Sequence, residues 1–246
     1  MKRDLTPAQA PVGLPQLAIA LDGPRIEPFE SILDELHGLP ILIKVGLSLF
    51  TAVGPSVVHH MELAGFRVFL DLKLHDIPHQ VGLAVQAAVK LDVAMLTVHL
   101  AGGRAMLDAA LEAARDRTRI IGVTVLTSLT DADLADVGSP DGVQATVLRR
   151  LQLAESVGLH GAVLSPRELA LAPRGRPGFL RVVPGIRDQA GVDDQARTAS
   201  AAQAMQAGAS ILVVGRPVLT SPSPRAAVEA LLATMATAWT IDAPNT

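Results

Sequence analysis

The chain contains no cysteine among its 246 residues. That absence excludes disulfide bonds, thiolate metal sites and cysteine nucleophiles. It is compatible with a reducing compartment, and we expect a cytoplasmic protein. No uninterrupted apolar run approaches the roughly 20 residues that a membrane-spanning helix needs, so we expect no membrane partner.

Long basic runs are also missing, and the formal net charge is only -3. The sequence therefore gives no electrostatic reason to expect nucleic acid as a partner, and any phosphate that the protein binds should belong to a small molecule. Residues 1–16 lack the apolar core of about 7 to 15 residues that marks a signal peptide, and we interpret them as a flexible tail. No linker-like stretch divides residues 17–246, which we expect to form a single domain.

What the chain does contain is a large apolar fraction, because 49% of its residues are hydrophobic and 18% are charged. That balance favours an ordered protein with a large buried core. Short apolar segments predict eight strands, at residues 17–21, 41–45, 68–72, 95–99, 120–126, 161–164, 180–183 and 211–214. Helical spacing of apolar residues predicts helices at residues 28–37, 55–64, 79–89, 104–114, 143–157, 193–207 and 224–239, with a short one near 165–172.

Strands that alternate with helices predict a parallel sheet, either closed into a (β/α)8 TIM barrel or spread into an open sheet. The positions of the polar residues favour the α/β barrel. They lie at or just beyond the carboxyl ends of all eight predicted strands: Asp22, Lys44, Asp71 with Lys73, His99, Thr127, Ser165, Arg187 and Arg216. In a barrel those ends meet at one mouth, where the active sites of this fold are built.

Charged residues interrupt the third predicted strand. Alternation along a strand puts Asp71 and Lys73 on one face, and Asp76 follows just beyond the expected end of the strand. With Lys44 and Asp22 they form either an ion-pair network that closes one end of the barrel or a site that moves protons. Carboxylates on each side would keep Lys73 charged and able to donate a proton to a developing carbanion, which favours the second interpretation.

Two glycine-containing loops follow the seventh and eighth predicted strands. The first reads Pro184-Gly185-Ile186-Arg187, and the second contains Gly215 and Arg216. Either the glycines serve ordinary turns and the arginines are solvated, or the loops bind phosphate through backbone N–H groups and guanidinium forks. Because these loops are the usual phosphate site of a barrel, their joint placement favours phosphate binding.

The seven histidines do not suggest a metal site. His75 and His79 have the i, i+4 spacing of helical ligands, but Pro78 between them makes a helix through both improbable. A zinc site also needs a converging third ligand, so we expect no metal. His99 is expected to be a barrel histidine with satisfied hydrogen bonds, and Gly102-Gly103 to allow a tight turn into the next helix.

Several motifs together resemble the orotidine 5'-phosphate decarboxylase family, from about residue 17 to residue 239. They are Ala20-Leu21-Asp22, Ile43-Lys44-Val45-Gly46, Asp71-x-Lys73-x-x-Asp76-Ile77-Pro78, Thr97-Val98-His99, Ala101-Gly102-Gly103, Leu126-Thr127-Ser128, Pro184-Gly185-Ile186-Arg187 and Val214-Gly215-Arg216. The Asp-x-Lys-x-x-Asp motif is shared with sugar-phosphate enzymes of the same superfamily. Lys44 and both phosphate loops make the combination more specific.

The resemblance implies decarboxylation of orotidine 5'-monophosphate to uridine 5'-monophosphate and CO2 in de novo pyrimidine biosynthesis, without a metal or organic cofactor. It implies that Lys73 protonates C6 while Asp71 lies against the departing carboxylate. Asp76, with Ile77 beside it, would come from the neighbouring subunit of a homodimer. Lys44 would complete the catalytic charge network.

The resemblance also implies which residues bind the nucleotide. Lys44 and Asp22 would contact the ribose, while Arg216, the backbone near Gly215 and Arg187 would hold the phosphate. The remaining substrate-binding positions it implies, toward the pyrimidine or its phosphate, are Thr127 or Ser128, Pro184 and Gln195. Residues 187–194, with Gly191 as a hinge, would form a lid.

Two alternatives stay open. One is a magnesium-dependent sugar-phosphate decarboxylase or aldolase of the same superfamily, but its members carry a carboxylate where this chain has Lys44, and a cation there would repel the metal. The other is a non-catalytic nucleotide-binding barrel that kept its phosphate loops, although the intact Asp71, Lys73 and Asp76 argue against it.

Overall fold

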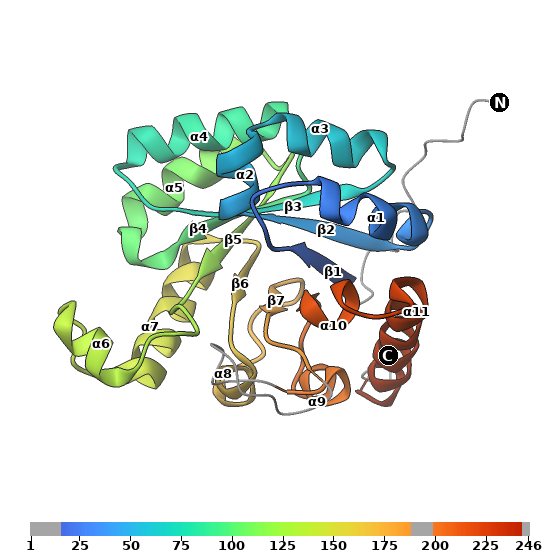
Figure 1. The fold of residues 1–246 in the computed structure, drawn as a ribbon. Coiled ribbons are helices and arrows are strands. Elements are labelled where there is room, and N and C mark those ends of the chain that lie inside the picture. Colours follow the sequence, from blue (N-terminus) through green and yellow to red (C-terminus); the bar gives the residue numbers. More distant parts are fainter. Residues whose placement is uncertain (1–15, 188–198, 243–246) are drawn as a thin grey trace.

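The structure, a computed structural model, describes residues 16–187 and 199–242 and contains a closed barrel of parallel strands in chain order (Figure 1). The strands are β1 (Gln16–Leu21), β2 (Ile41–Gly46), β3 (Arg67–Leu74), β4 (Met95–His99), β5 (Arg119–Val123), β6 (Gly161–Val163), β7 (Leu180–Val183) and β8 (Ile211–Val214). The predicted (β/α)8 barrel is therefore confirmed. β1 begins one residue earlier than predicted, inside the expected tail, and residues 1–15 lie outside the described part of the chain.

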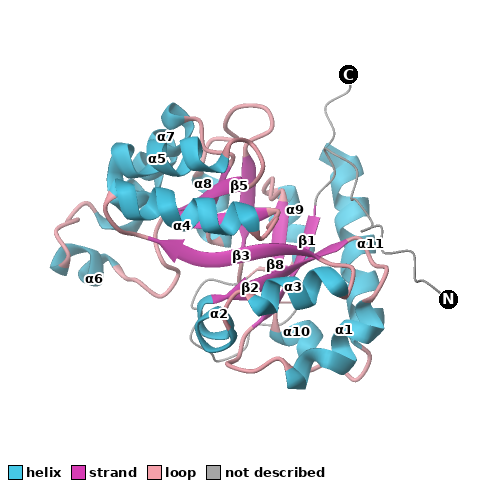
Figure 2. Cartoon of the chain, turned by 90° about the horizontal axis from the view of Figure 1, so that it is seen from above, coloured by secondary structure: helices cyan, strands magenta, loops and turns pink. Residues whose placement is uncertain are grey.

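Helices surround the strands, as Figure 2 shows from above. They are η1 (Glu27–Phe29), α1 (Glu30–Leu36), α2 (Leu47–Val53), α3 (Ser56–Leu63), α4 (Pro78–Lys90), η2 (Leu100–Gly102), α5 (Gly103–Ala114), α6 (Asp131–Asp136), α7 (Gly142–Val157), α8 (Pro166–Leu171), α9 (Ala201–Gln206), α10 (Arg216–Leu219) and α11 (Pro224–Asp242). The short α2, α6 and α10 were not predicted. α9 covers only the second half of its predicted range, part of which is not described.

Apolar side chains form two separate cores, one on each side of the strands. Ala18, Phe69 and Met95 belong to the cluster inside the barrel, whereas the larger cluster joins the outer strand faces to the helices. The last helix, α11, packs against α1 and α9, so the chain closes its own ring of helices. Within residues 16–187 and 199–242, no helix has the length and apolarity to cross a membrane.

Two strands end two or three residues away from their predicted ends. β3 continues to Leu74, because its pairing with β4 shifts register between Leu70 and Leu74. β5 stops at Val123, short of the predicted residue 126. Beyond it, the Thr124 hydroxyl donates to the Val163 carbonyl at 2.7 Å, and the Arg150 guanidinium donates to the Thr124 carbonyl. Side-chain hydrogen bonds thus take the place of strand pairing at Thr124, and the residues that follow it line the mouth of the barrel.

The amino-terminal end of β7 carries a buried arginine that fastens two helices. Arg181 is 3% exposed and donates to the carbonyls of Leu169, Ala172 and Ala207, at or just beyond the carboxyl ends of α8 and α9. A cation at these ends also interacts favourably with the helix dipoles. Burial, with repulsion from Arg174, lowers the pKa of Arg181 to about 10, which leaves it charged at neutral pH.

Candidate active site

A cavity of about 260 Å³ opens where the carboxyl ends of the strands meet. Its walls come from β1, β2, β3, β5, β6, β7 and β8 or from the loops that follow them. Most of the residues that the sequence pointed to lie on these walls: Asp22, Lys44, Asp71, Lys73, Thr127, Pro184, Arg187, Gly215 and Arg216. The barrel thus brings the charged cluster and both glycine loops to one cavity.

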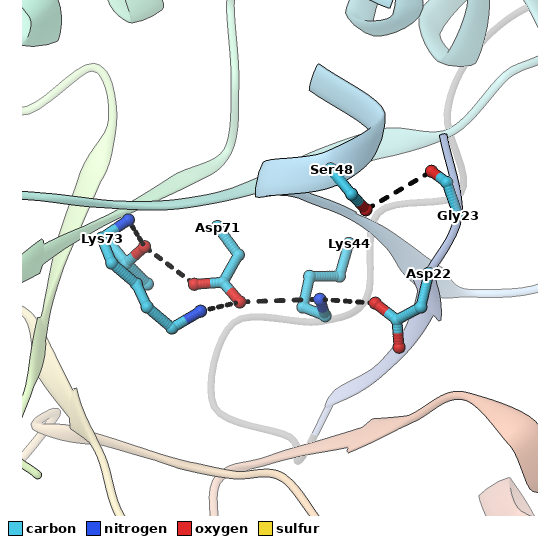
Figure 3. Close-up of polar contacts among 7 residues, drawn as sticks. Asp22, Gly23, Lys44, Ser48, Asp71 and Lys73 are labelled. Carbon is cyan, nitrogen blue, oxygen red and sulfur yellow. Dashed lines mark hydrogen bonds and ion pairs between the residues drawn. The ribbon is translucent and has the colours of Figure 1, made fainter. Parts of the chain in front are cut away.

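Acids and lysines alternate in a row along one wall (Figure 3). Lys73 Nζ lies 2.8 Å from Asp71 Oδ2, and Lys44 Nζ lies 3.5 Å from the same oxygen. Lys44 Nζ is also 3.4 Å from Asp22 Oδ1. The side chains of Lys44 and Asp71 are 11% and 13% exposed, against 68% for Asp22, so the row runs from a buried centre toward solvent.

Asp71 is held in its charged form despite its burial. Desolvation raises the pKa of the carboxyl, but the charges of Lys44 and Lys73 and hydrogen bonds from Lys73 and Thr97 outweigh it, so the net pKa is lowered. Thr97 Oγ1 donates to Asp71 Oδ1 at 2.9 Å while Lys73 donates to Oδ2. Both carboxylate oxygens therefore have partners, and the group is fixed in orientation.

Lys73 occupies an unusual backbone conformation at the register shift of β3. Its φ is +51°, in the left-handed region that side chains other than glycine seldom adopt. Its backbone N–H donates to Thr97 Oγ1 at 2.8 Å. Thr97, in the adjacent strand, therefore holds the carboxylate of Asp71 and the backbone of Lys73 with one hydroxyl.

Thr97 is the site residue that the sequence analysis missed. It appeared there only as part of a motif. The available signal was its position two residues before His99, because strand alternation puts the two side chains on the same face of β4. The structure shows that Thr97 is fully buried there.

The two glycine-containing loops line the same cavity, with Gly185 after β7 and Gly215 after β8. A Cβ on Gly215 would lie 3.3 Å from Asp22 Oδ2 and 3.6 Å from the Ala20 carbonyl oxygen. Gly185 has a φ of +78°. On its far side, the Arg187 N–H donates to the Ala199 carbonyl at 2.9 Å, which joins the two ends of the loop. The intervening residues, with the expected lid, its Gly191 hinge and Gln195, lie outside the described residues.

Three predicted site residues do not line this cavity: Asp76, Ile77 and Ser128. Asp76 is exposed, and its Oδ1 accepts the backbone N–H of Ile77 at 2.6 Å. Ile77 is 63% exposed at the start of α4. The proposed contribution of Asp76 and Ile77 across a dimer stays a prediction.

The structure agrees with the expectation for His75 and His79 and differs from the expectation for His99. α4 begins at Pro78, so no helix passes through both His75 and His79, as predicted. His99, however, is not satisfied: its Nδ1 is buried without a hydrogen-bond partner, and its ring stacks on that of His75. Among the described residues, no group of three or more histidine, aspartate or glutamate side chains is arranged to hold a metal.

Comparisons with known proteins show the family to which this chain belongs. The family model of the Orotidine 5'-phosphate decarboxylase / HUMPS family matches residues 15–231. An orotidine 5'-phosphate decarboxylase of Halorhodospira halophila is 46% identical, with 92% of this chain and 98% of the relative covered. One from Opitutus terrae is 42% identical, with 88% and 96% covered.

A solved structure leads to the same family. The crystal structure of orotidine 5'-phosphate decarboxylase from Lactobacillus acidophilus superposes with a TM-score of 0.79 at 31% sequence identity, covering 90% of this chain and 99% of that one. The family resemblance noted from the motifs is thereby confirmed. The chain is an enzyme that belongs to the Orotidine 5'-phosphate decarboxylase / HUMPS family.

Proposed function

We propose that this enzyme decarboxylates orotidine 5'-monophosphate to uridine 5'-monophosphate and CO2 in pyrimidine biosynthesis. The observation that carries the proposal is the cavity itself, which is lined both by alternating acids and lysines and by two glycine–arginine loops. The reacting pyrimidine would lie at the charged wall and the phosphate at the loops. The names of the relatives give the substrate and the reaction.

Lys73 is the proton donor in this proposal. When the bond between C6 and the carboxylate breaks, CO2 leaves and the electron pair remains on C6. The ammonium of Lys73 transfers a proton to that carbon, and water then reprotonates the amine. Asp71, ionised and 2.8 Å from Lys73 Nζ, holds the ammonium in place before the transfer.

Asp71 and Lys44 supply a fixed field around the reacting carbon. Because Asp71 is held by Lys73, Lys44 and Thr97, its charge cannot turn away when the substrate carboxylate approaches. Positioned dipoles and charges of this kind stabilise a transition state without reorganising during the reaction. Lys44 also lies between Asp71 and Asp22, from where it would contact the ribose.

The phosphate does not react, so its binding would help through positioning. Arg216 and Arg187, with the backbone at Gly215, would hold the phosphate from two loops of the same cavity. Thr127, which also lines the cavity, would contact the pyrimidine or its phosphate, and Pro184 is a further substrate-binding residue in the same cavity. Ser128 and Gln195 remain further candidates from the family pattern.

We further propose a cytoplasmic homodimer in which Asp76 and Ile77 of each chain complete the site of the other. Support comes from two observations: both residues are exposed on a single chain, and both follow directly after β3, whose carboxyl end forms part of the mouth. With Ile77 63% exposed and Asp76 exposed, both side chains are accessible to a second copy of the chain. Each active site would then require two chains.

A magnesium-dependent sugar-phosphate enzyme is the second candidate within this family. Lys44 argues against it, because its ammonium lies between the two carboxylates, Asp22 and Asp71, that a metal would need. Against a non-catalytic nucleotide-binding barrel, the third candidate, stands the intact pair of ionised Asp71 and Lys73 in the cavity, because perturbed ionisable groups in a cleft favour a catalytic site.

One assay separates the three. Purified protein is mixed with orotidine 5'-monophosphate, with and without excess chelator, and the ultraviolet absorbance of the pyrimidine is followed. We expect turnover that the chelator does not affect. Chelator-sensitive activity on a keto sugar phosphate would favour the second candidate, and binding without turnover at any enzyme concentration would favour the third.

A further inference from the structure

His75 and His99 form a contact to which the proposed reaction assigns no role. Their ring centroids are 5.4 Å apart with an interplanar angle of 28°, a stacked arrangement. His99 is the last residue of β4, and His75 is the first residue after β3. The stack therefore ties the carboxyl ends of two neighbouring strands together at the mouth of the barrel.

The His75 ring also lies close to Gly102, which ends η2 just after β4. A Cβ added to Gly102 would be 3.3 Å from His75 Cδ2 and would overlap Met106 Sδ. His75 itself is exposed, and the stacked His99 ring covers one face of its imidazole. A side chain at residue 102 would displace the ring or Met106.

His99 is suited to be a neutral support. Its Nδ1 is buried and lacks a hydrogen-bond partner, so that nitrogen does not fix the ring. Burial, with repulsion from His75, Arg150 and Lys73, lowers the pKa of His99 to about 4. The ring is therefore uncharged at neutral pH and adds no further positive charge near Lys73.

We propose that His99 is a positioning residue: by stacking on His75, it fixes the direction in which Asp76 and Ile77 leave the barrel. His75 immediately precedes Asp76, so rotation of the His75 ring and backbone would carry the Asp76 carboxylate with it. The inference rests on the proposed function, in which Asp76 acts in the site of the partner. It follows that His99 affects the active site of the other subunit rather than that of its own.

Mixed dimers test that direction. The His99→Ala and Lys73→Ala chains are each expected to be nearly inactive alone. In a mixed dimer, the site with an intact Lys73 receives Asp76 from the Lys73→Ala chain, whose His99 is intact. Random pairing of equal amounts makes half of the dimers mixed, each with one complete site, so activity should recover to about a quarter of the wild-type value.

A parallel mixture separates this inference from the proposed function. Asp76→Ala with Lys73→Ala should also recover about a quarter of the activity if the site is shared. Recovery there, but none with His99→Ala, would overturn the role of His99 alone. No recovery in either mixture would overturn the shared site and, with it, the inference.

Two further variants keep the test independent of folding. His75→Ala changes an exposed residue, and its mixture with Lys73→Ala should recover activity in the same way. His99→Phe keeps a flat ring without nitrogens and should restore most of the kcat that His99→Ala loses. If His99→Phe folds but is as inactive as His99→Ala, the ring nitrogens matter rather than the stack, and the proposal fails. His59→Ala, on the exposed face of α3, is the matched control.

Discussion

Thr97 Oγ1 lies 2.9 Å from Asp71 Oδ1 and donates its proton to that oxygen. Since it also accepts the Lys73 N–H, we expect Thr97→Val to lower kcat by about 10- to 100-fold, the cost of roughly 1.5–3 kcal/mol for a hydrogen bond to a charged group. KM should change less, because the contact orients reacting groups. Thr97→Ser, which keeps the hydroxyl, should recover most of the rate. Steady-state kinetics with wild-type rates in Thr97→Val would contradict this assignment.

Replacing Lys73 should separate folding from chemistry. The Lys73 side chain is 38% exposed, so Lys73→Ala should fold and show the circular dichroism spectrum of the wild type. It should lose nearly all activity, because no other described ammonium lies within 3 Å of Asp71. Lys90→Ala, at the exposed end of α4, is the control and should be fully active. Substantial turnover by Lys73→Ala would remove the lysine from its role.

The arginine loop should control affinity for the phosphate. Arg216→Ala is expected to raise KM by about 10- to 100-fold, because charge-assisted contacts contribute roughly 1.5–3 kcal/mol. Inhibition by inorganic phosphate should weaken in parallel. Arg67→Ala, an exposed arginine at the start of β3, should leave both unchanged. Equal phosphate inhibition of Arg216→Ala and the wild type would place the phosphate elsewhere.

His99 should make the stability of the fold depend on pH in a mildly acidic window. Its pKa is about 4 in the folded chain and near 6.5 when unfolded, so between these values the unfolded state binds more protons. The titration of His99 therefore leaves the free energy of unfolding unchanged above pH 6.5, and it decreases this free energy as the pH falls from 6.5 toward 4. Urea denaturation should show this decline in the wild type and a smaller decline in His99→Phe. An identical decline in both proteins would contradict the assignment, and the surface variant His59→Gln should resemble the wild type.

Sequence reasoning succeeded where one physical rule dominates. Alternation of apolar strands and helices was enough for the closed barrel, and the polar residues at strand ends, such as Asp22 and Arg216, do meet in one cavity. Pro78 also excluded a helix through His75 and His79, and α4 begins at Pro78, one residue before the predicted start, because proline fits the first turn of a helix but not its interior. In these cases local pattern and global fold agree.

It failed where a side chain from elsewhere decides the local backbone. Nothing within residues 120–126 shows that Arg150, on α7, will take the Thr124 carbonyl and end β5 early. The register shift at Lys73 likewise depends on Thr97 in another strand. The absence of a hydrogen-bond partner for His99 Nδ1 also depends on which groups surround the ring in the folded chain, and strand position alone had suggested a satisfied ring.

The left-handed backbone at Lys73 makes the stability of the fold depend on which residue stands at that position. A non-glycine residue in that conformation costs about 1–2 kcal/mol relative to an ordinary one, and the surrounding fold has to offset it. Glycine adopts the same conformation without that cost. A Lys73→Gly chain should therefore melt at a higher temperature than Lys73→Ala, although both lack the ammonium. Among variants that lack the lysine, a screen for thermal stability would therefore favour glycine over alanine at residue 73, whereas the wild-type lysine offsets its backbone cost through its 2.8 Å ion pair with buried Asp71.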